Sequence, residues 1–153
     1  MSSGLDIKVN LENNVAEVIL TGRIDEDANF EALTSCEANV FHLNFSGVNL
    51  INSCGVRELI NLVTALNQKA KIIYKSCPQI MIEQMNMVEG FLPANASIES
   101  FYAPYFDPDA DEEIKVLLRI QEVSNKKAPI KKNDSGTELE FDALEAQYFN
   151  FIK

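Results

Sequence analysis

Polar and apolar residues alternate along the beginning of the chain, which is the pattern of a half-buried β-strand. The alternation covers residues 6–12 and resumes over residues 15–21, with the pair Asn13-Asn14 between the two runs. Because asparagine tolerates the backbone conformations of tight turns, this pattern predicts a β-hairpin. The loop over residues 22–27 then leads into a short predicted helix at about residues 29–35, whose acidic start suits the helix dipole.

An apolar run followed by a helical stripe comes next. Residues 40–45 are predicted to form a buried strand, and Ser46-Gly47 is typical of a turn. A short apolar run then reaches Ser53, a residue type that often caps a helix N-terminus. From there the apolar residues recur at spacings of three and four, which predicts one continuous helical face. This face consists of Val56, Leu59, Ile60, Val63 and Leu66.

Two more strands and one more helix complete this part of the chain. Residues 71–75 predict another buried strand, and a helix is expected to begin near Pro78 and to end at Gly90. Residues 97–102 alternate again and predict a final strand. The predicted order is β-β-α-β-α-β-α-β. The fold class is therefore expected to be α/β, with a mixed β-sheet and helices mainly on one face.

The last third of the chain has a different hydrophobic pattern. Apolar residues near positions 114–118 and 144–152 predict two helices, separated by a lysine-rich linker at 126–132. We therefore expect two parts, a domain over residues 1–102 and a small, α-rich C-terminal extension over residues 103–153. Since every predicted strand lies before residue 103, the first part is expected to fold alone.

Composition narrows the function. The chain of 153 residues has 46% hydrophobic and 24% charged residues, which is ordinary for a globular protein, and its formal net charge is -10. Acidic residues outnumber basic ones in both parts, with 12 against 6 in residues 1–102 and 11 against 7 in residues 103–153. Nucleic-acid binding needs clustered Lys and Arg, so it is not expected.

Localisation follows from two further patterns. No apolar run approaches membrane-spanning length, and residues 1–10 lack both the basic start and the apolar core of a signal peptide. The cysteines Cys36, Cys54 and Cys77 are odd in number and widely spaced, which favours reduced thiols over disulfides or a metal site. We therefore expect a cytoplasmic protein that makes no membrane contact.

Two short motifs carry a family resemblance. Asn44-Phe45-Ser46-Gly47-Val48 and Asn52-Ser53-Cys54-Gly55-Val56 are separated by a short apolar run. Together they resemble the signature of the STAS domain, which bacterial anti-sigma factor antagonists share with the tails of anion transporters. In that signature, Asp-Leu-Ser-Gly-Val leads to Asp-Ser-Ser-Gly-Leu at a helix start. Gly22 and Asp25 also match the pattern that the family has after its second strand.

The resemblance implies a function and a site. It implies a regulatory module that switches protein partners in signal transduction and bacterial transcription regulation, with an anti-sigma-type serine kinase as partner. Phosphorylation is implied at Ser53. The implied partner-binding residues are Asp25, Asn52, Ser53, Cys54, Gly55 and Arg57. Two of these depart from the family pattern, because Asn52 replaces an aspartate and Cys54 replaces a second serine.

The same residues allow other interpretations. Ser53 could serve only as an N-cap, and Gly55 could leave space for a partner at the helix end. The helix start could instead bind an anion or a nucleotide, making the chain a small-ligand sensor or a scaffold subunit. An enzyme is not expected, because no glycine-rich phosphate loop is present and the single histidine, His42, has no evident nucleophile partner. No catalytic residue and no cofactor are predicted.

The extension has a second, looser resemblance. Two of its turns are spaced like the knuckles of a zinc ribbon, with the Cys-Pro-x-Cys positions at residues 107–110 and 132–135, but no cysteine occurs at any of them. A plain helical extension is the alternative. Since residues 103–153 contain neither Cys nor His, we predict no zinc and expect apolar packing to hold the extension. The predicted cluster consists of Tyr102, Tyr105, Phe106, Leu117, Leu118, Phe141, Leu144, Tyr148, Phe149 and Ile152.

Overall fold

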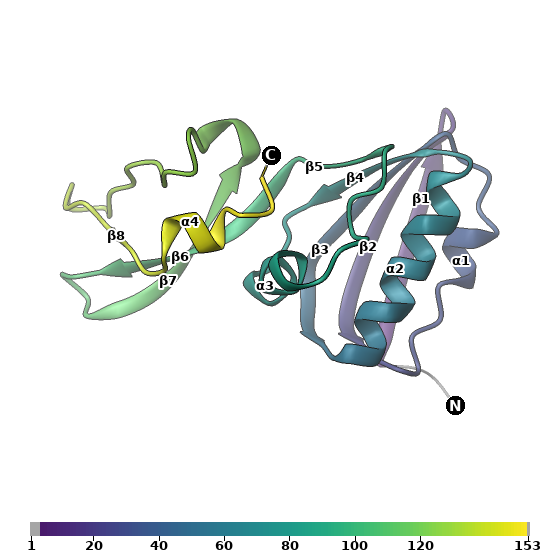
Figure 1. Cartoon of the computed structure of the whole chain (residues 1–153), viewed down its shortest axis with the longest axis horizontal. Coiled ribbons are helices and arrows are strands. Elements are labelled where there is room, and N and C mark those ends of the chain that lie inside the picture. Colours follow the sequence, from purple (N-terminus) through teal and green to yellow (C-terminus); the bar gives the residue numbers. More distant parts are fainter. Residues whose placement is uncertain (1–3, 153) are drawn as a thin grey trace.

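The computed structural model describes residues 4–152, which form two lobes that meet at helix α3 (Figure 1). The first lobe is built on a five-stranded sheet in the order β1-β2-β3-β4-β5. Strands β1 and β2 pair antiparallel, as the predicted hairpin requires, and the remaining pairs are parallel. The strands are β1 (Leu5–Glu12), β2 (Val15–Ile24), β3 (Val40–Ile51), β4 (Lys71–Lys75) and β5 (Ala96–Ile98).

Helices cover one face of this sheet. Helices α1 (Glu31–Thr34) and α2 (Ser53–Asn67) pack beside each other, and α3 (Gln79–Met87) lies between the sheet and the second lobe. Strand β2 shows the two-sided pattern, because Val18 is buried whereas Ile19 is half exposed on the opposite face. The expected α/β architecture, a mixed sheet with helices mainly on one face, is confirmed.

Strand β3 corrects the predicted turn at Ser46-Gly47. The strand continues from Val40 to Ile51 without interruption, and its register against β2 shifts between the pairs Ile19–Asn44 and Thr21–Gly47. Such a shift is a β-bulge, which bends a strand without ending it. The small residues mark this irregularity, so the strand extends directly to the start of α2.

The second lobe is a β-structure, so the prediction of an α-rich extension is wrong. A three-stranded sheet in the order β7-β6-β8 replaces the expected helices. Residues 114–118 belong to a strand in which Ile114, Val116 and Leu118 are more buried than their neighbours, a period of two that the helical interpretation overlooked. The elements are β6 (Ser100–Asp107), β7 (Glu112–Arg119), β8 (Glu140–Phe141), the 3-10 helix η1 (Ile120–Glu122) and the short helix α4 (Glu145–Tyr148).

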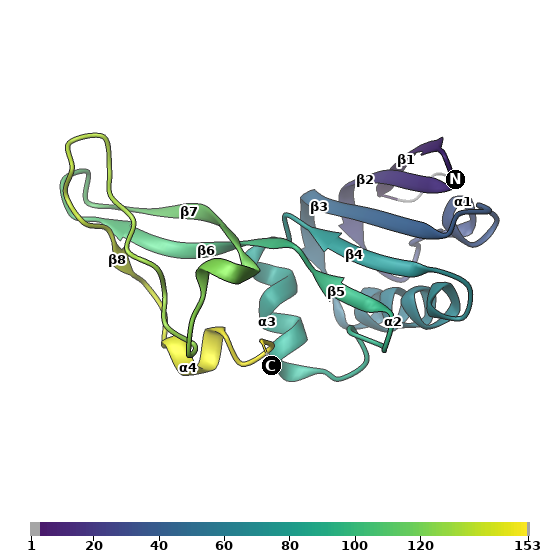
Figure 2. The same ribbon diagram turned by 90° about the horizontal axis from the view of Figure 1, so that it is seen from above.

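The two lobes share a hydrophobic core. The expected boundary between residues 102 and 103 falls inside β6, and Figure 2 shows this strand running from the end of β5 into the second lobe. Phe101 on β6 is fully buried, and its ring centroid lies 6.1 Å from that of Phe149 and 5.1 Å from that of Phe151. The C-terminal residues therefore close the core beside α3. That residues 5–102 fold alone remains a prediction.

An aromatic cluster occupies the centre of the second lobe. Phe141 stacks on Phe149 with centroids 5.1 Å apart, and it meets Tyr105 edge-on at 5.4 Å. The Tyr148 hydroxyl donates a hydrogen bond of 2.6 Å to the Tyr102 carbonyl oxygen. Burial raises the pKa of Tyr148, so the hydroxyl stays protonated as a donor. The cluster is smaller than expected, because Leu117 and Leu144 are exposed.

A second set of contacts joins the two turns that the zinc-ribbon resemblance singled out. The side-chain nitrogen of Asn133 donates to Asp107 at 2.9 Å and to Asp109 at 2.8 Å. Its side-chain oxygen accepts from the backbone nitrogens of Ser135 at 2.9 Å and Thr137 at 3.0 Å. The Asn133 side chain therefore stabilises its own turn and links it to the turn at residues 107–109. No group of three or more Cys, His, Asp or Glu residues within residues 4–152 could hold a metal ion.

Replacing Asn133 with alanine is expected to destabilise the second lobe by about 2 kcal/mol, because the substitution removes several hydrogen bonds and leaves half-buried groups unpaired. Chemical denaturation of the variant measures this change. Asp134→Ala provides the matched control, because Asp134 is exposed and the effect there should stay within about 0.5 kcal/mol. Equal stabilities of the two variants would contradict a structural role for Asn133.

No helix in the described part of the chain is long and apolar enough to cross a membrane.

Candidate functional site

The start of α2 is capped by Asn52, which corrects the idea that Ser53 is the cap. The Asn52 side-chain oxygen accepts a hydrogen bond of 2.8 Å from the Gly55 backbone nitrogen, and Asn52 has the extended backbone of an N-cap residue. Ser53 is the first helical residue. Its side chain is exposed, and its hydroxyl makes no hydrogen bond within residues 4–152. The cap therefore leaves the serine hydroxyl available.

The backbone next to Asn52 is anchored to the sheet. The Asn52 backbone nitrogen donates to the Ile24 carbonyl oxygen at 3.2 Å, where β2 and β3 end side by side. A Cβ atom placed on Gly55 would lie 1.9 Å from the same carbonyl oxygen. Gly55 is buried, and its lack of a side chain makes room for the end of β2. The sequence had suggested instead that this space was left for a partner. The helix start is therefore held firmly against the strand.

The loop after β2 forms one side of the site. Asp25 is 8% exposed, and its carboxylate accepts a hydrogen bond of 3.0 Å from the Asp27 backbone nitrogen. The Arg23 side-chain nitrogen lies 3.6 Å from the other carboxylate oxygen. Asp25 was expected among the partner-binding residues. Its burial and these contacts show that it shapes the loop, and its part in partner binding stays a prediction.

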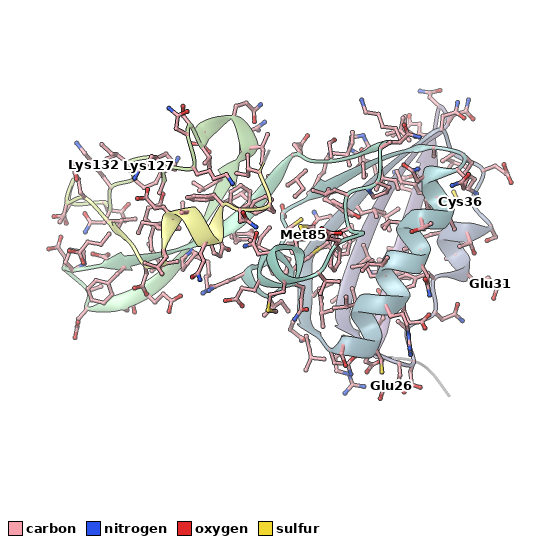
Figure 3. All side chains as sticks on the ribbon, viewed as in Figure 1. Glu26, Glu31, Cys36, Met85, Lys127 and Lys132 are labelled. Atoms are coloured by element: carbon pink, nitrogen blue, oxygen red, sulfur yellow. The ribbon has the colours of Figure 1, made fainter. Side chains whose placement is uncertain are left out.

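Glu26 is a site residue that the sequence reasoning missed. Its carboxylate accepts a hydrogen bond of 2.9 Å from the Asn52 side-chain nitrogen (Glu26 is labelled in Figure 3). This hydrogen bond, together with a backbone hydrogen bond and the Arg23 guanidinium, holds the pKa of Glu26 below its usual range. An exposed carboxylate therefore stays ionised at the start of α2. No local sequence pattern indicates this proximity, because it depends on the strand register that places Ile24 beside Ile51.

The exposed part of the site is a shallow groove between α2 and α3. Ser53 and Arg57 are exposed at its edge, and Cys54 is half-buried beside them. The groove has a volume of about 330 Å³. Its lining combines an apolar floor with polar edges: Ser53, Val56, Arg57, Ile60, Asn61, Gln84 and Val88. A mixed surface of this kind is suited to contact with a protein.

The single histidine lies away from this groove. His42 alternates along β3 with the buried residues Phe41 and Leu43, so it occupies the sheet face opposite the helices. Its Nδ1 atom lies 4.0 Å from Glu17 on the neighbouring strand. His42 therefore cannot act as a base for Ser53 or Cys54 across the sheet. The Ser53 hydroxyl is displayed at the exposed helix start, on the other side of the sheet from His42.

Replacing Asn52 with alanine is expected to reduce the free energy of unfolding by about 1 kcal/mol and to raise the pKa of Glu26 toward its ordinary value. Because the folded-state pKa is lowered, the contribution of Glu26 to stability is present above the unfolded-state pKa. It is lost as the pH falls through the folded-state value. NMR titration of the Glu26 carboxyl carbon, with exposed Asn61→Ala as control, measures the shift. An unchanged titration would contradict the hydrogen bond.

Comparisons with solved structures find likenesses in backbone shape. No protein-family model matches the sequence, and no curated protein matches it. A solved structure described as an anti-sigma factor antagonist from Mycobacterium paratuberculosis aligns with a TM-score of 0.40 and 19% sequence identity. The alignment covers 48% of this chain and 68% of that chain. The likeness concerns backbone shape over about half of the chain.

Proposed function

We propose that the chain is a non-enzymatic regulatory module, similar to anti-sigma factor antagonists, that binds a protein partner through the start of α2. The observation that carries this proposal is the fixed presentation of Ser53 and Arg57. Both side chains are exposed, while Asn52 and Gly55 beside them are held against β2. A surface that is already ordered loses little entropy when a partner binds. The motif resemblance supplies the class of partner.

Phosphorylation of Ser53 is the regulatory step that we propose. Ser53 is the first residue of a helix of 15 residues, where the helix dipole favours negative charge. A phosphate there would add nearly two negative charges to the surface that the partner contacts. Glu26 already places one carboxylate beside Asn52 and opposes the added charge. The modifying enzyme would be an anti-sigma-type serine kinase, in the cytoplasm of a bacterial host.

Intact-mass measurement tests the phosphorylation. The chain is incubated with ATP and host lysate, and we expect the mass of a single phosphate on the wild type and none on Ser53→Ala. Glu26→Gln should be modified faster, because the opposing carboxylate is removed. Unmodified wild type would exclude the regulatory step and leave a binder that does not depend on phosphorylation.

Affinity capture from the host tests the docking surface itself. The wild type and two charge reversals, Arg57→Glu and Lys132→Glu, serve as bait. Arg57 lies at the proposed surface, whereas Lys132 is exposed in the second lobe (Figure 3). We expect Arg57→Glu to lose a partner that the other two baits retain. Loss of that partner from both variants would point to a general charge effect and contradict the proposed site.

The alternative of an anion or nucleotide sensor receives less support. The Asn52 side chain already accepts the hydrogen bond of the Gly55 backbone nitrogen at the helix start. The Glu26 carboxylate lies next to the Asn52 side chain. An anion would have to displace the Asn52 side chain and would be repelled by the Glu26 carboxylate. Isothermal titration with nucleotides is therefore expected to give no measurable heat of binding. A nucleotide that binds the wild type, and binds Asn52→Ala more tightly because the Gly55 nitrogen is then free, would favour the sensor.

A further inference from the structure

A second groove lies between α3 and α4, where the two lobes meet. It has a volume of about 700 Å³ and is larger than the groove at Ser53. Its lining includes Gln79, Glu83, Gln84, Met87, Leu144 and Gln147. Gln84 also lines the groove beside Ser53, so the two grooves share α3. Figures 1 and 2 both show α3 and α4 side by side at this junction.

Two exposed apolar side chains belong to opposite sides of the groove. Met87 at the end of α3 is 71% exposed, and Leu144 before α4 is 70% exposed. Apolar side chains on facing elements offer a partner more contact area than the same residues scattered over a surface. Methionine is flexible and adapts to apolar partners of different shapes. The groove therefore has the composition of an apolar docking site.

The walls of the groove are tied together. The Asn86 side-chain nitrogen on α3 donates a hydrogen bond of 2.9 Å to the Tyr148 carbonyl oxygen on α4. Tyr148 in turn donates to Tyr102 on β6 at 2.6 Å. Both contacts join residues of α4 to earlier parts of the chain. A groove with fixed walls is formed before a partner arrives, which lowers the cost of binding.

The charges around the groove indicate the chemistry of its partner. Glu83 is the single charged residue among those that line the groove. Glu89, just after the end of α3, is likewise the single charged residue that lines the adjoining cavity. Lys115, which bonds to Gln79 at one end, is paired with Glu113 at 2.6 Å. A second copy of the chain, with its own net charge of -10, would be repelled. A basic partner would be attracted.

We propose that the α3–α4 groove binds an amphipathic helix of a partner protein, with an apolar stripe between Met87 and Leu144 and Lys or Arg residues facing Glu83 and Glu89. Helix α3 has 9 residues, and at about 1.5 Å per residue it spans about 13 Å. A partner helix of two to three turns would present anchors at positions i, i+3 or i+4, and i+7 along that length. The contact goes beyond the Ser53 surface and does not depend on it.

Synthetic peptides test this proposal on the full chain. The first peptide carries leucines at i, i+3, i+4 and i+7 and lysines elsewhere. The second has the same composition in scrambled order, and the third has glutamate in place of lysine. We expect only the first to bind in fluorescence anisotropy, with NMR shifts centred on Met87 and Leu144. Added salt should weaken its binding. Equal binding of the scrambled peptide, or no binding of the first, would overturn the proposal.

Variants locate the binding. Met87→Ser and Leu144→Ser should each weaken the first peptide about 10-fold, which is the effect expected of an apolar anchor. Ile130→Ser is the matched control, because Ile130 is also an exposed apolar residue at 73% and lies outside the groove. Ser53→Ala, which changes no charge, should leave peptide binding unchanged, and this separates the surface from the Ser53 site. Equal losses in the control, or a dimer that Met87→Ser dissociates, would contradict the proposed occupant.

Discussion

Replacing Gly55 with alanine is expected to destabilise the chain by about 3 kcal/mol and to displace the start of α2. The added Cβ atom would lie 1.9 Å from the Ile24 carbonyl oxygen, a distance that forces the backbone to move. A helical glycine with free space around it would behave in the opposite way, because alanine favours the helix by up to about 1 kcal/mol. Chemical denaturation therefore distinguishes the two cases by the sign of the change.

Gly136→Ala is the matched control for this substitution. Nothing lies within 4 Å of a Cβ atom at Gly136, whose φ of +84° is strained for alanine. The expected cost there is about 1 kcal/mol, from backbone conformation alone. If Gly55→Ala stabilised the chain, the close contact between α2 and β2 would be contradicted, and with it the rigid presentation of Ser53.

Replacing Phe149 with alanine is expected to cost about 4 kcal/mol, the loss typical of a large side chain removed from a core. Phe149 is fully buried and contacts the rings of Phe101, Phe141 and Tyr148. Because Phe101 links this cluster to the first lobe, both lobes should unfold in one transition at a lower temperature. Differential scanning calorimetry measures this change.

Leu144→Ala serves as the control for Phe149→Ala, since Leu144 is 70% exposed and should change stability by less than about 0.5 kcal/mol. A variant in which the second lobe melts early while the first keeps its melting temperature would contradict the shared core. That result would favour the sequence-based division near residue 102.

The sequence predicted the first lobe well because its patterns have one dominant period. Residues 6–12 and 15–21 alternate, and α2 carries a regular apolar stripe from Val56 to Leu66. The prediction failed for strand β7 because its apolar residues fit both the helical and the strand period. Ile114, Leu117 and Leu118 are spaced as in a helix, whereas Ile114, Val116 and Leu118 are spaced as in a strand. Pairing with β6, which no local pattern reveals, favours the strand.

The sequence singled out residues of the candidate site, but it assigned the role of helix cap to the wrong residue. The motif located the helix start, but both Asn52 and Ser53 are residues that cap helices, and only the structure shows that Asn52 does so. Glu26 lay in a loop that the sequence treated as a connection, because its contact with Asn52 spans 26 positions. Long-range contacts of this kind depend on strand register, which the local pattern does not contain.

A crosslinking residue placed at the docking surface tests the central claim most directly. A photoreactive amino acid replaces Arg57 in one chain and Lys132 in another, and both are expressed in the host and illuminated. Both positions are exposed, so neither replacement should disturb the fold. We predict one discrete crosslinked protein at position 57 that is absent at position 132 and that weakens when Ser53 is also changed to Asp. The same product at both positions, or none at position 57, would contradict a docking site at the start of α2.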